Sequence, residues 1–381
     1  MISRPANHLT GRSGIREMMD LAATLEDVIH LEIGEPDFPT PPHIVEAVQK
    51  ALCDGNVKYT LSRGDASLRA LIAEKLRRRN GIDAQPDRIV VTPGGTSAVF
   101  AALMATIENG DGVLIPDPGW PTFEMATLFA RGRPIRYRLS PESGFQPDLE
   151  ELELLARDAR VLVLNSPANP TGAVLPRATI ERILELAARH DLVILSDEIY
   201  EQIVFEGETF SPASLDTDGR VISVFSFSKD YAMTGWRIGY LHASVEIVES
   251  VVRIQEATIA CPSWPGQRAA EAALTGPQDA VASMCAEYHA RRDLAADRLE
   301  RHGLLAGRPA GAFYILARVG EPQIDTFEFS RRLLTEEHVA VAPGQTFGPG
   351  GAGLVRLSLA SQAEVAAAGI DRLARFVSSK P

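Results

Sequence analysis

Five short apolar runs, each followed by a stretch with a helical pattern, constrain the fold more than any other feature of the chain. They are rich in Val, Ile and Leu and lie at residues 88–92, 112–115, 160–164, 192–195 and 221–225. Their hydrophobicity is continuous rather than alternating, which indicates strands buried on both faces, as in a parallel sheet covered by helices. Between two of them, residues 177–190 place Ile180, Ile183 and Ala187 on one helical stripe. This βαβα order predicts a large α/β domain with a mainly parallel sheet, which we place at residues 45–285.

The C-terminal part of the chain has a different pattern. It contains a long charged helix, two short strands and two further helices, at residues 278–302, 312–316, 354–358, 325–338 and 362–378. Strands and helices that are mixed in this way predict a smaller α+β domain. We expect this small domain to comprise residues 1–44 and 286–381.

The charge and the cysteines limit the possible partners. Asp and Glu number 50 against 38 Lys and Arg, so the net charge of −12 disfavours non-specific binding to nucleic acid or anionic membranes. The three cysteines are widely spaced and the eight histidines show no metal-ligand spacing, so neither a disulfide framework nor a metal site is expected. The sequence shows neither a signal peptide nor an apolar run long enough for a membrane span. We therefore expect a soluble, cytoplasmic protein.

Polar residues directly follow four of the predicted strands. Because the carboxyl ends of parallel strands meet at one edge of the sheet, and ligands bind there, we expect these residues to lie together. They are a glycine turn with small hydroxyls, two asparagines, an aspartate–tyrosine pair and a serine–lysine pair: residues 94–97, Asn165, Asn169, Asp197, Tyr200, Ser226 and Lys229.

Each of these features also has an ordinary structural interpretation. The glycine turn opens a helix whose free N–H groups suit an anion, but many such turns only cap a helix. Asp197 could be a helix N-cap. Lys229 lies among apolar residues, where desolvation would lower its pKa and favour an amine nucleophile, although most loop lysines are solvated. It is their coincidence at one sheet edge that favours a binding site.

In their order and spacing these motifs resemble those of the class I and II aminotransferases, the fold-type-I enzymes that use pyridoxal phosphate. The resemblance covers nearly the whole chain. The motifs lie at residues 34–41, 59, 95–98, 117–120, 169–172, 197–200, 226–229, 234–237 and 355–358. Each motif is common by itself, whereas the ordered set is specific.

The resemblance implies a role for each matching residue around the cofactor ring. Lys229 would bind pyridoxal phosphate covalently and, once released, move the Cα proton as base and acid. Asp197 would pair with the pyridine nitrogen and keep it protonated. Tyr200 and Asn169 would hydrogen-bond the phenolic oxygen, and Trp120 would stack on the ring.

The resemblance also implies which residues bind the phosphate of the cofactor. The phosphate would lie on the backbone of Gly95 and Thr96, beside Ser226 and Arg237. Tyr59 would reach the phosphate of the neighbouring subunit, which implies a homodimer.

Arg356 would bind the substrate α-carboxylate through two parallel hydrogen bonds, a geometry that guanidinium provides and ammonium does not. Asn169 and the Gly34 backbone N–H would complete this clamp.

Such an enzyme moves the amino group of an L-amino acid to a 2-oxo acid, with 2-oxoglutarate as the default acceptor. The resemblance implies ping-pong kinetics, in which the cofactor alternates between its pyridoxal and pyridoxamine forms. The donor stays open, because no second arginine can be placed as an anchor for a dicarboxylate.

Several alternatives compete with this interpretation. The same residues are compatible with a carbon–sulfur β-lyase, a decarboxylase or an oxidase, because the cofactor can direct the same electrons to different products. A ligand sensor fused to a DNA-binding domain is disfavoured, since roughly 30 residues precede Gly34. Residues 226–229 also fit the serine-nucleophile pattern SxxK, but the SDN and KTG partners are missing. Residues 348–353 spell GxGxxG, but they precede a strand instead of following one.

The loop at residues 260–266 is an unusual variant within this resemblance. It contains Trp264 and two prolines before a helical stretch. We expect it to reshape either the substrate entrance or the dimer contact.

Overall fold

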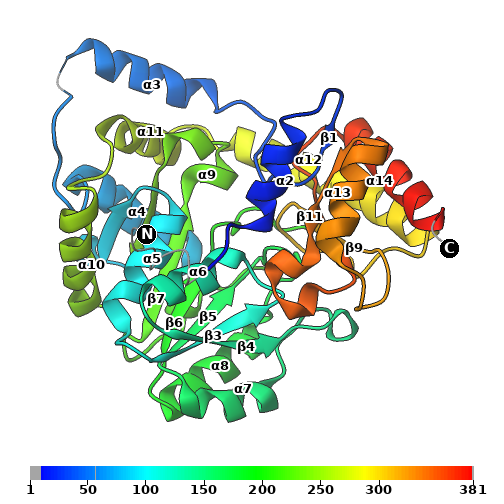
Figure 1. Cartoon of the computed structure of the whole chain (residues 1–381). Coiled ribbons are helices and arrows are strands. Elements are labelled where there is room, and N and C mark those ends of the chain that lie inside the picture. The colour runs from blue at the N-terminus through cyan, green and yellow to red at the C-terminus, as the bar shows by residue number, and fades with distance from the viewer. Residues whose placement is uncertain (1–9, 56, 380–381) are drawn as a thin grey trace, which may run out of the picture.

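A seven-stranded sheet forms the centre of the protein, which is represented here by a computed structural model that describes residues 10–55 and 57–379 (Figure 1). The strand order is β2-β8-β7-β6-β5-β3-β4, in which β8 runs antiparallel to both neighbours and the other pairs are parallel. The strands are β2 (Ile89–Thr92), β3 (Gly112–Asp117), β4 (Arg133–Arg138), β5 (Val161–Asn165), β6 (Val193–Asp197), β7 (Val221–Ser226) and β8 (Gly239–His242). The predicted α/β architecture with a mainly parallel sheet is confirmed.

Helices cover both faces of this sheet (Figure 1). In β5, Val161 and Val163 face the layer formed by α5 (Gly95–Thr106), α6 (Pro121–Phe129) and α10 (Val245–Thr258). Leu162 and Leu164 face the opposite layer, which contains α7 (Leu149–Leu155) and α8 (Arg177–Arg189). Successive side chains of a strand point to opposite faces, so covering both faces buries every residue of β5. This explains why the strand sequences are continuously hydrophobic.

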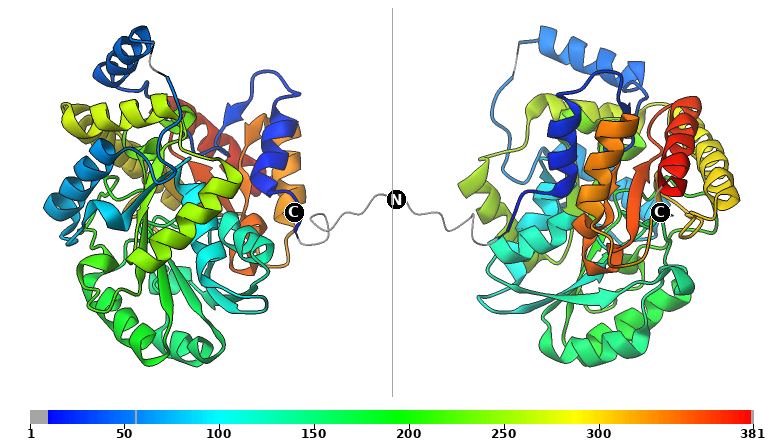
Figure 2. Two further views of the ribbon diagram at one scale, coloured as in Figure 1. Left: turned by 90° about the vertical axis from the view of Figure 1, so that its left-hand side faces the viewer. Right: turned by 45° about the vertical axis from the view of Figure 1, so that its right-hand side comes forward.

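A further group of helices packs beside β2 and β8. It consists of α3 (Pro42–Cys53), α4 (Ala66–Asn80) and α11 (Trp264–Thr275). Ile44 of α3 and Leu68 of α4 are fully buried in this cluster together with Tyr240 of β8. In both views of Figure 2, α3 lies at the periphery of the molecule.

The C-terminal part forms a separate group of elements. Its antiparallel sheet has the order β11-β12-β9, and β1 pairs in parallel with β10. Around these strands lie α12, α13 and α14, with α2 beside α13 (Figure 2). The bounds are α2 (Gly14–Ala22), β1 (Ile29–His30), α12 (Asp279–Arg301), β9 (Tyr314–Arg318), α13 (Thr326–Glu337), β10 (Val339–Ala340), β11 (Ala342–Pro343), β12 (Leu354–Ser358) and α14 (Ala363–Ser378). Helix α12 crosses the boundary we predicted at residue 285, and the division into two domains stays a prediction.

Two negative observations apply to the part of the chain that the structure describes. None of its helices combines the length and the hydrophobicity needed to cross a lipid bilayer. None of its His, Cys, Asp and Glu side chains gather in a group of three or more that could hold a metal ion.

Candidate active site

A cavity of about 770 Å³ opens where the large sheet meets the C-terminal group of elements. Its walls come from the segments that follow β5, β6 and β7, the first turns of α5 and α6, strands β9 and β12, residues 33–35, and α2 with the residues just before it. Of the twelve residues to which the family resemblance gives a role, ten line it, namely Gly34, Gly95, Thr96, Trp120, Asn169, Tyr200, Ser226, Lys229, Arg237 and Arg356. The two exceptions are Asp197 and Tyr59.

Lys229 follows β7 directly, in the short helix α9 (Phe227–Asp230). Its Nζ donates a hydrogen bond to the backbone carbonyl of Gly34 at 2.6 Å. Burial and then the positive charge of Arg356 lower the pKa of Lys229 to about 8. An amine with this pKa is neutral in a substantial fraction of molecules near pH 7–8, so it can act as a nucleophile or a base.

Asp197 ends β6 and lies beneath the lining of the cavity, with 1% of its surface exposed. The backbone N–H of Ile199, a residue that does line the cavity, donates to Oδ1 of Asp197 at 3.3 Å. Burial raises the pKa of Asp197 to about 7, while this hydrogen bond and the charge of Lys229 act in the opposite direction. A cation that enters the cavity beside this carboxyl would favour its ionised form.

Arg356 lies on β12 and is 2% exposed. Its Nη1 donates to Oδ1 of Asn169 at 3.1 Å, and its Nη2 donates to the backbone carbonyl of Glu32. The guanidinium carbon lies 4.2 Å from the centre of the Tyr314 ring, and burial lowers the pKa of Arg356. Its buried Nε has no hydrogen-bond partner, and no carboxylate of the described residues lies within ion-pair distance of the guanidinium, so the chain orients this cation without neutralising it.

Two tyrosines join the large sheet to β9 at the floor of the cavity. The hydroxyls of Tyr200 and Tyr314 are 2.9 Å apart, and burial raises the pKa of Tyr200 well above its usual value. A Cβ at Gly34 would lie 1.7 Å from the Tyr314 hydroxyl oxygen, so only glycine fits there.

An anion cradle lies at the start of α5. Gly94 has a φ of +85°, and a Cβ on it would lie 2.6 Å from Nη2 of Arg237. No side chain caps this helix, so its first backbone N–H groups remain open to a ligand. Arg237 has a left-handed φ of 50°, and its Nη1 donates to the Thr234 carbonyl at 2.9 Å. The amides and the guanidinium together suit a phosphate.

The remaining predicted residues occupy the rim and the outside of the cavity. Trp120 precedes α6 and packs edge-to-face on Phe123, with ring centres 5.5 Å apart. Ser226 uses its Oγ to accept the backbone N–H of Ser228 at 3.1 Å. Tyr59 lies between α3 and α4 and is 90% exposed, outside the cavity of its own chain.

Sequence reasoning missed several residues that line the cavity. The most important are Arg12, Arg16, Glu35, Thr234 and Tyr314. Glu35 and Thr234 lie within the family motifs at residues 34–41 and 234–237, which could have indicated them. Nothing in the sequence linked α2 or β9 to this site.

Comparison with known proteins assigns the family. The chain matches the family "Aminotransferase class I and II" over residues 26–373. It belongs to this family. It is 40% identical to aromatic-amino-acid aminotransferase 2 of Thermococcus litoralis, over 97% of this chain and 96% of that protein. It is also 40% identical to the aspartate aminotransferase of Pyrococcus abyssi, over 98% and 97% of the two chains.

The fold agrees with this assignment. The structure is similar to that of the aspartate aminotransferase of Thermus thermophilus with maleate, with a TM-score of 0.93, 36% identity and 99% of each chain covered. The class I and II aminotransferase described here is therefore an enzyme of amino-group transfer, as the sequence predicted. The alternatives of a non-catalytic sensor or a serine-nucleophile enzyme are set aside.

A second buried carboxyl group of this aminotransferase lies next to Asp197 in the chain. Glu198 is 5% exposed and accepts a hydrogen bond from the Ser211 hydroxyl at 2.9 Å. Burial raises the pKa of Glu198 from 4.5 to about 8, although hydrogen bonds from serines oppose the shift. The folded chain therefore retains a proton that the unfolded chain releases.

This proton makes stability depend on pH in a defined direction. Because the pKa is raised in the folded state, wild-type protein loses stability as the pH rises from about 4.5 to about 8, by up to about 1.4 kcal/mol per pH unit. Glu198→Gln removes this contribution, so its free energy of unfolding should increase relative to wild type between pH 5 and pH 8. Urea unfolding of the cofactor-free proteins at the two pH values measures it. If the free energy of unfolding changes equally with pH in the two proteins, the raised pKa of Glu198 is contradicted.

Proposed function

We propose that this aminotransferase holds pyridoxal phosphate at Lys229 and moves the amino group of an L-amino acid to 2-oxoglutarate. The observation that carries the proposal is the buried Lys229 amine, with its lowered pKa, in one cavity with the unneutralised Arg356. A nucleophilic amine and a carboxylate-binding guanidinium are the two groups that an amino acid and an aldehyde cofactor require.

The residues of the site fit the cofactor. The cradle of Gly95, Thr96 and Arg237 suits its phosphate, and the buried carboxyl of Asp197 suits its ring nitrogen. Trp120 is available to cover the ring. Pyridoxal phosphate, when bound, supplies an electron sink for the electrons of the broken Cα–H bond.

The chain's own residues then perform three tasks. Arg356, held by Asn169, binds the substrate α-carboxylate, and the backbone N–H of Gly34 supports it. Lys229 accepts the Cα proton at Nζ as a general base. It then donates this proton from the same nitrogen as a general acid. Burial keeps Tyr200 protonated and Tyr314 orients it, so that it can donate a hydrogen bond into the cavity.

The clamp predicts a defined effect of Arg356→Lys. Lysine keeps the positive charge but offers no bidentate fork, so the KM for amino acids should rise about 100-fold, the equivalent of about 3 kcal/mol of lost charged hydrogen bonds. The visible absorbance of the bound cofactor should persist, because Arg356 does not hold it. Steady-state kinetics with a cofactor titration separates the two effects. An unchanged KM, or loss of the cofactor instead, would contradict this role.

An arginine that lines the cavity supports a dicarboxylic substrate. Arg12 pairs with Asp20 at 2.7 Å, whereas the described part of the chain offers Arg16 no carboxylate partner and only a weak contact with Sδ of Met19. Arg16→Ala should therefore raise the KM for 2-oxoglutarate about three- to tenfold, as expected for one solvent-exposed charged contact. The KM for phenylpyruvate, which lacks the second carboxylate, should stay within about twofold of wild type. Equal changes for both acceptors would remove Arg16 from this role.

We further propose a homodimer in the cytoplasm. Tyr59 is far too exposed for a residue that serves its own site, which supports the idea that it reaches a neighbouring one. An apolar cavity of about 420 Å³ lies between α5, α6 and α10, and beside it Phe129 and Ile259 are exposed. Sedimentation velocity at micromolar concentration tests the dimer. The three cysteines, all of them free thiols, are compatible with a reducing compartment and support the location.

An absorbance titration tests the reaction itself. The cofactor-loaded protein is mixed with each common amino acid in the absence of any oxo acid. Loss of the visible band together with stoichiometric release of a 2-oxo acid supports amino-group transfer to the cofactor and names the donor. A stable band with release of ammonia and pyruvate would favour β-elimination instead.

A further inference from the structure

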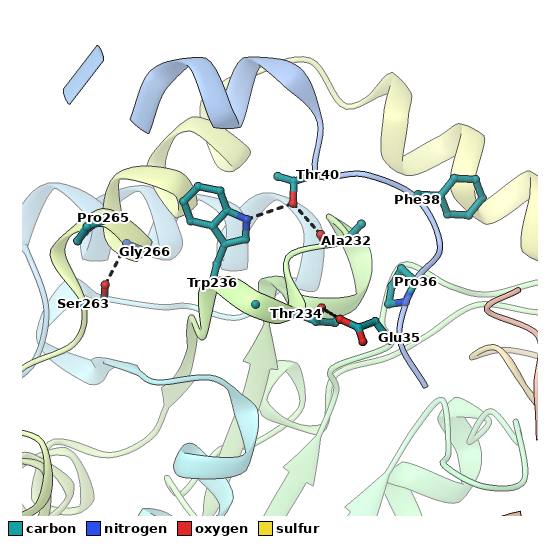
Figure 3. Close-up of a pocket in the computed structure, with 11 residues that line it drawn as sticks. Glu35, Pro36, Phe38, Thr40, Ala232, Thr234, Trp236, Ser263, Pro265 and Gly266 are labelled. Atoms are coloured by element: carbon teal, nitrogen blue, oxygen red, sulfur yellow. Dashed lines mark hydrogen bonds between the residues drawn. The ribbon is translucent and has the colours of Figure 1, made fainter. Parts of the chain in front are cut away.

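A second cavity, of about 530 Å³, adjoins the active-site cavity (Figure 3). Three residues line both cavities, namely Glu35, Thr234 and Gly235. At this boundary the Thr234 hydroxyl donates to Oε1 of Glu35 at 2.6 Å, and Figure 3 shows the two side chains meeting. Neither residue has a role in the proposed reaction.

Glu35 belongs to a segment that is fixed at its two ends. We call residues 31–40 the strap. At one end, the backbone N–H of Leu31 donates to the Ala340 carbonyl at 2.9 Å. At the other end, the Thr40 hydroxyl donates to the Ala232 carbonyl at 2.8 Å and accepts the Trp236 Nε1–H at 3.1 Å (Figure 3).

The middle of the strap lacks such backbone support. Among the described residues, no backbone–backbone hydrogen bond involves residues 33–38. Asp37 is held by an ion pair with the buried Arg291, at 2.8 Å. On the cavity side, the hydrogen bond from Thr234 to Glu35 is the contact nearest to Gly34, whose carbonyl accepts the hydrogen bond from Lys229.

We propose that Glu35 is a positioning residue: through its hydrogen bond with Thr234 it fixes the strap so that the Gly34 carbonyl holds the Lys229 amine in place. This inference rests on the proposed function of Lys229. The hydrogen bond between Thr234 and Glu35 links the turn that carries Arg237 to the segment whose Gly34 carbonyl orients the reacting amine. A strap released at this point would leave Lys229 without a fixed acceptor.

The charge of Glu35 offers a competing explanation. This carboxylate also raises the pKa of Lys229, against the larger effects of burial and Arg356. Glu35→Gln keeps an oxygen that can accept from Thr234 but removes the charge. Thr234→Val removes the donor but keeps both the shape and the charge of Glu35. The two variants therefore separate the hydrogen bond from the charge.

The first measurement uses the cofactor-free protein. The rate at which acetic anhydride acetylates Lys229 is followed by mass spectrometry of the Lys229 peptide at pH 7.5. We expect Thr234→Val and Glu35→Ala to increase this rate about three- to tenfold, the change expected from loss of one hydrogen bond, and Thr234→Ser to restore it. Thr40→Val is the matched control, because it removes a threonine hydrogen bond from the same strap away from Gly34. Its rate should match wild type.

The second measurement uses the cofactor-loaded protein in single turnovers with the donor found for wild type. Thr234→Val and Glu35→Ala should lower the rate constant of amino-group transfer about three- to tenfold with little change in amino-acid affinity, and the double variant should be no slower than either single variant. Glu35→Gln should stay within about twofold of wild type.

The outcomes distinguish this proposal from the proposed function. If Glu35→Gln is as impaired as Glu35→Ala while Thr234→Val behaves as wild type, charge is responsible and the positioning role is overturned. An acetylation rate that rises equally in Thr40→Val also overturns it, because any loosening of the strap would then suffice. If wild type itself transfers no amino group, the proposed function fails, whereas the acetylation rates still decide how Lys229 is held.

Discussion

Replacement of Lys229 by alanine is expected to remove the visible absorbance of the bound cofactor and to lower kcat about 10⁴-fold, the upper range for loss of a general acid–base group. Lys229 is the one lysine among the described residues that line the cavity, so no other amine is placed to take over. The fold should survive, because the Lys229 amine makes a single hydrogen bond, to Gly34.

Lys229→Arg is the matched control for this experiment. Arginine keeps the positive charge beside Asp197, but its pKa is too high for it to lose a proton near neutral pH. It should therefore be as inactive as the alanine variant. Absorbance spectra, circular dichroism and single-turnover assays with added pyridoxal phosphate measure these effects. Turnover by Lys229→Arg at more than about a hundredth of the wild-type rate would show that Lys229 is not the proton carrier.

How much of the fold could be read from the sequence depended on burial. Strands β3, β5 and β7 are buried along their whole length, and their unbroken hydrophobic runs predicted them. Strand β4 was missed because it is an edge strand, and only one of its residues is buried. Strand β8 was missed because Gly239 and His242 leave only two apolar residues between them, so no continuous hydrophobic run marks it.

The candidate site was predictable where a residue follows a strand directly. Lys229 and Asp197 stand at such positions, and topology alone brings strand ends together. Arg16 and Tyr314 could not be found in this way, because they reach the cavity from α2 and β9, and the packing of these elements against the large sheet depends on long-range contacts. Glu35 lies within the motif at residues 34–41, but its hydrogen bond with Thr234 joins residues 199 positions apart and is visible only in three dimensions.

Asp197 illustrates a position that the sequence located but could not describe. The sequence placed it at a strand end, where it was equally compatible with a helix cap. The structure shows a carboxyl that is 1% exposed, lies under the cavity lining and has a pKa raised to about 7 by burial. Such a group is costly to ionise until a cation arrives beside it.

Replacement of Asp197 by asparagine should therefore act on the reaction and on stability in opposite ways. Asparagine has the same shape but cannot hold a positive charge on the ring nitrogen of the cofactor, so kcat should fall about 10²–10³-fold, as for loss of one preorganised electrostatic contact. Without cofactor, wild-type protein pays for ionising Asp197 as the pH rises from about 4 to about 7, because its pKa is raised on folding. The variant is free of that cost, so its stability relative to wild type should increase over this range.

Glu198→Gln is the matched control for Asp197→Asn. It also replaces a buried acid by its amide, one residue along the chain, but Glu198 lines a different cavity and is not among the charges that act on Lys229. Its kcat should stay within about twofold of wild type, while its stability responds to pH in the same direction as that of Asp197→Asn. Steady-state rates and urea unfolding at pH 5 and pH 8 measure both effects. If the two variants lose activity equally, burial of a negative charge near β6 is what matters, and Asp197 has no specific role opposite the cofactor nitrogen. If Asp197→Asn alone is slow, the effect belongs to the Asp197 carboxylate itself.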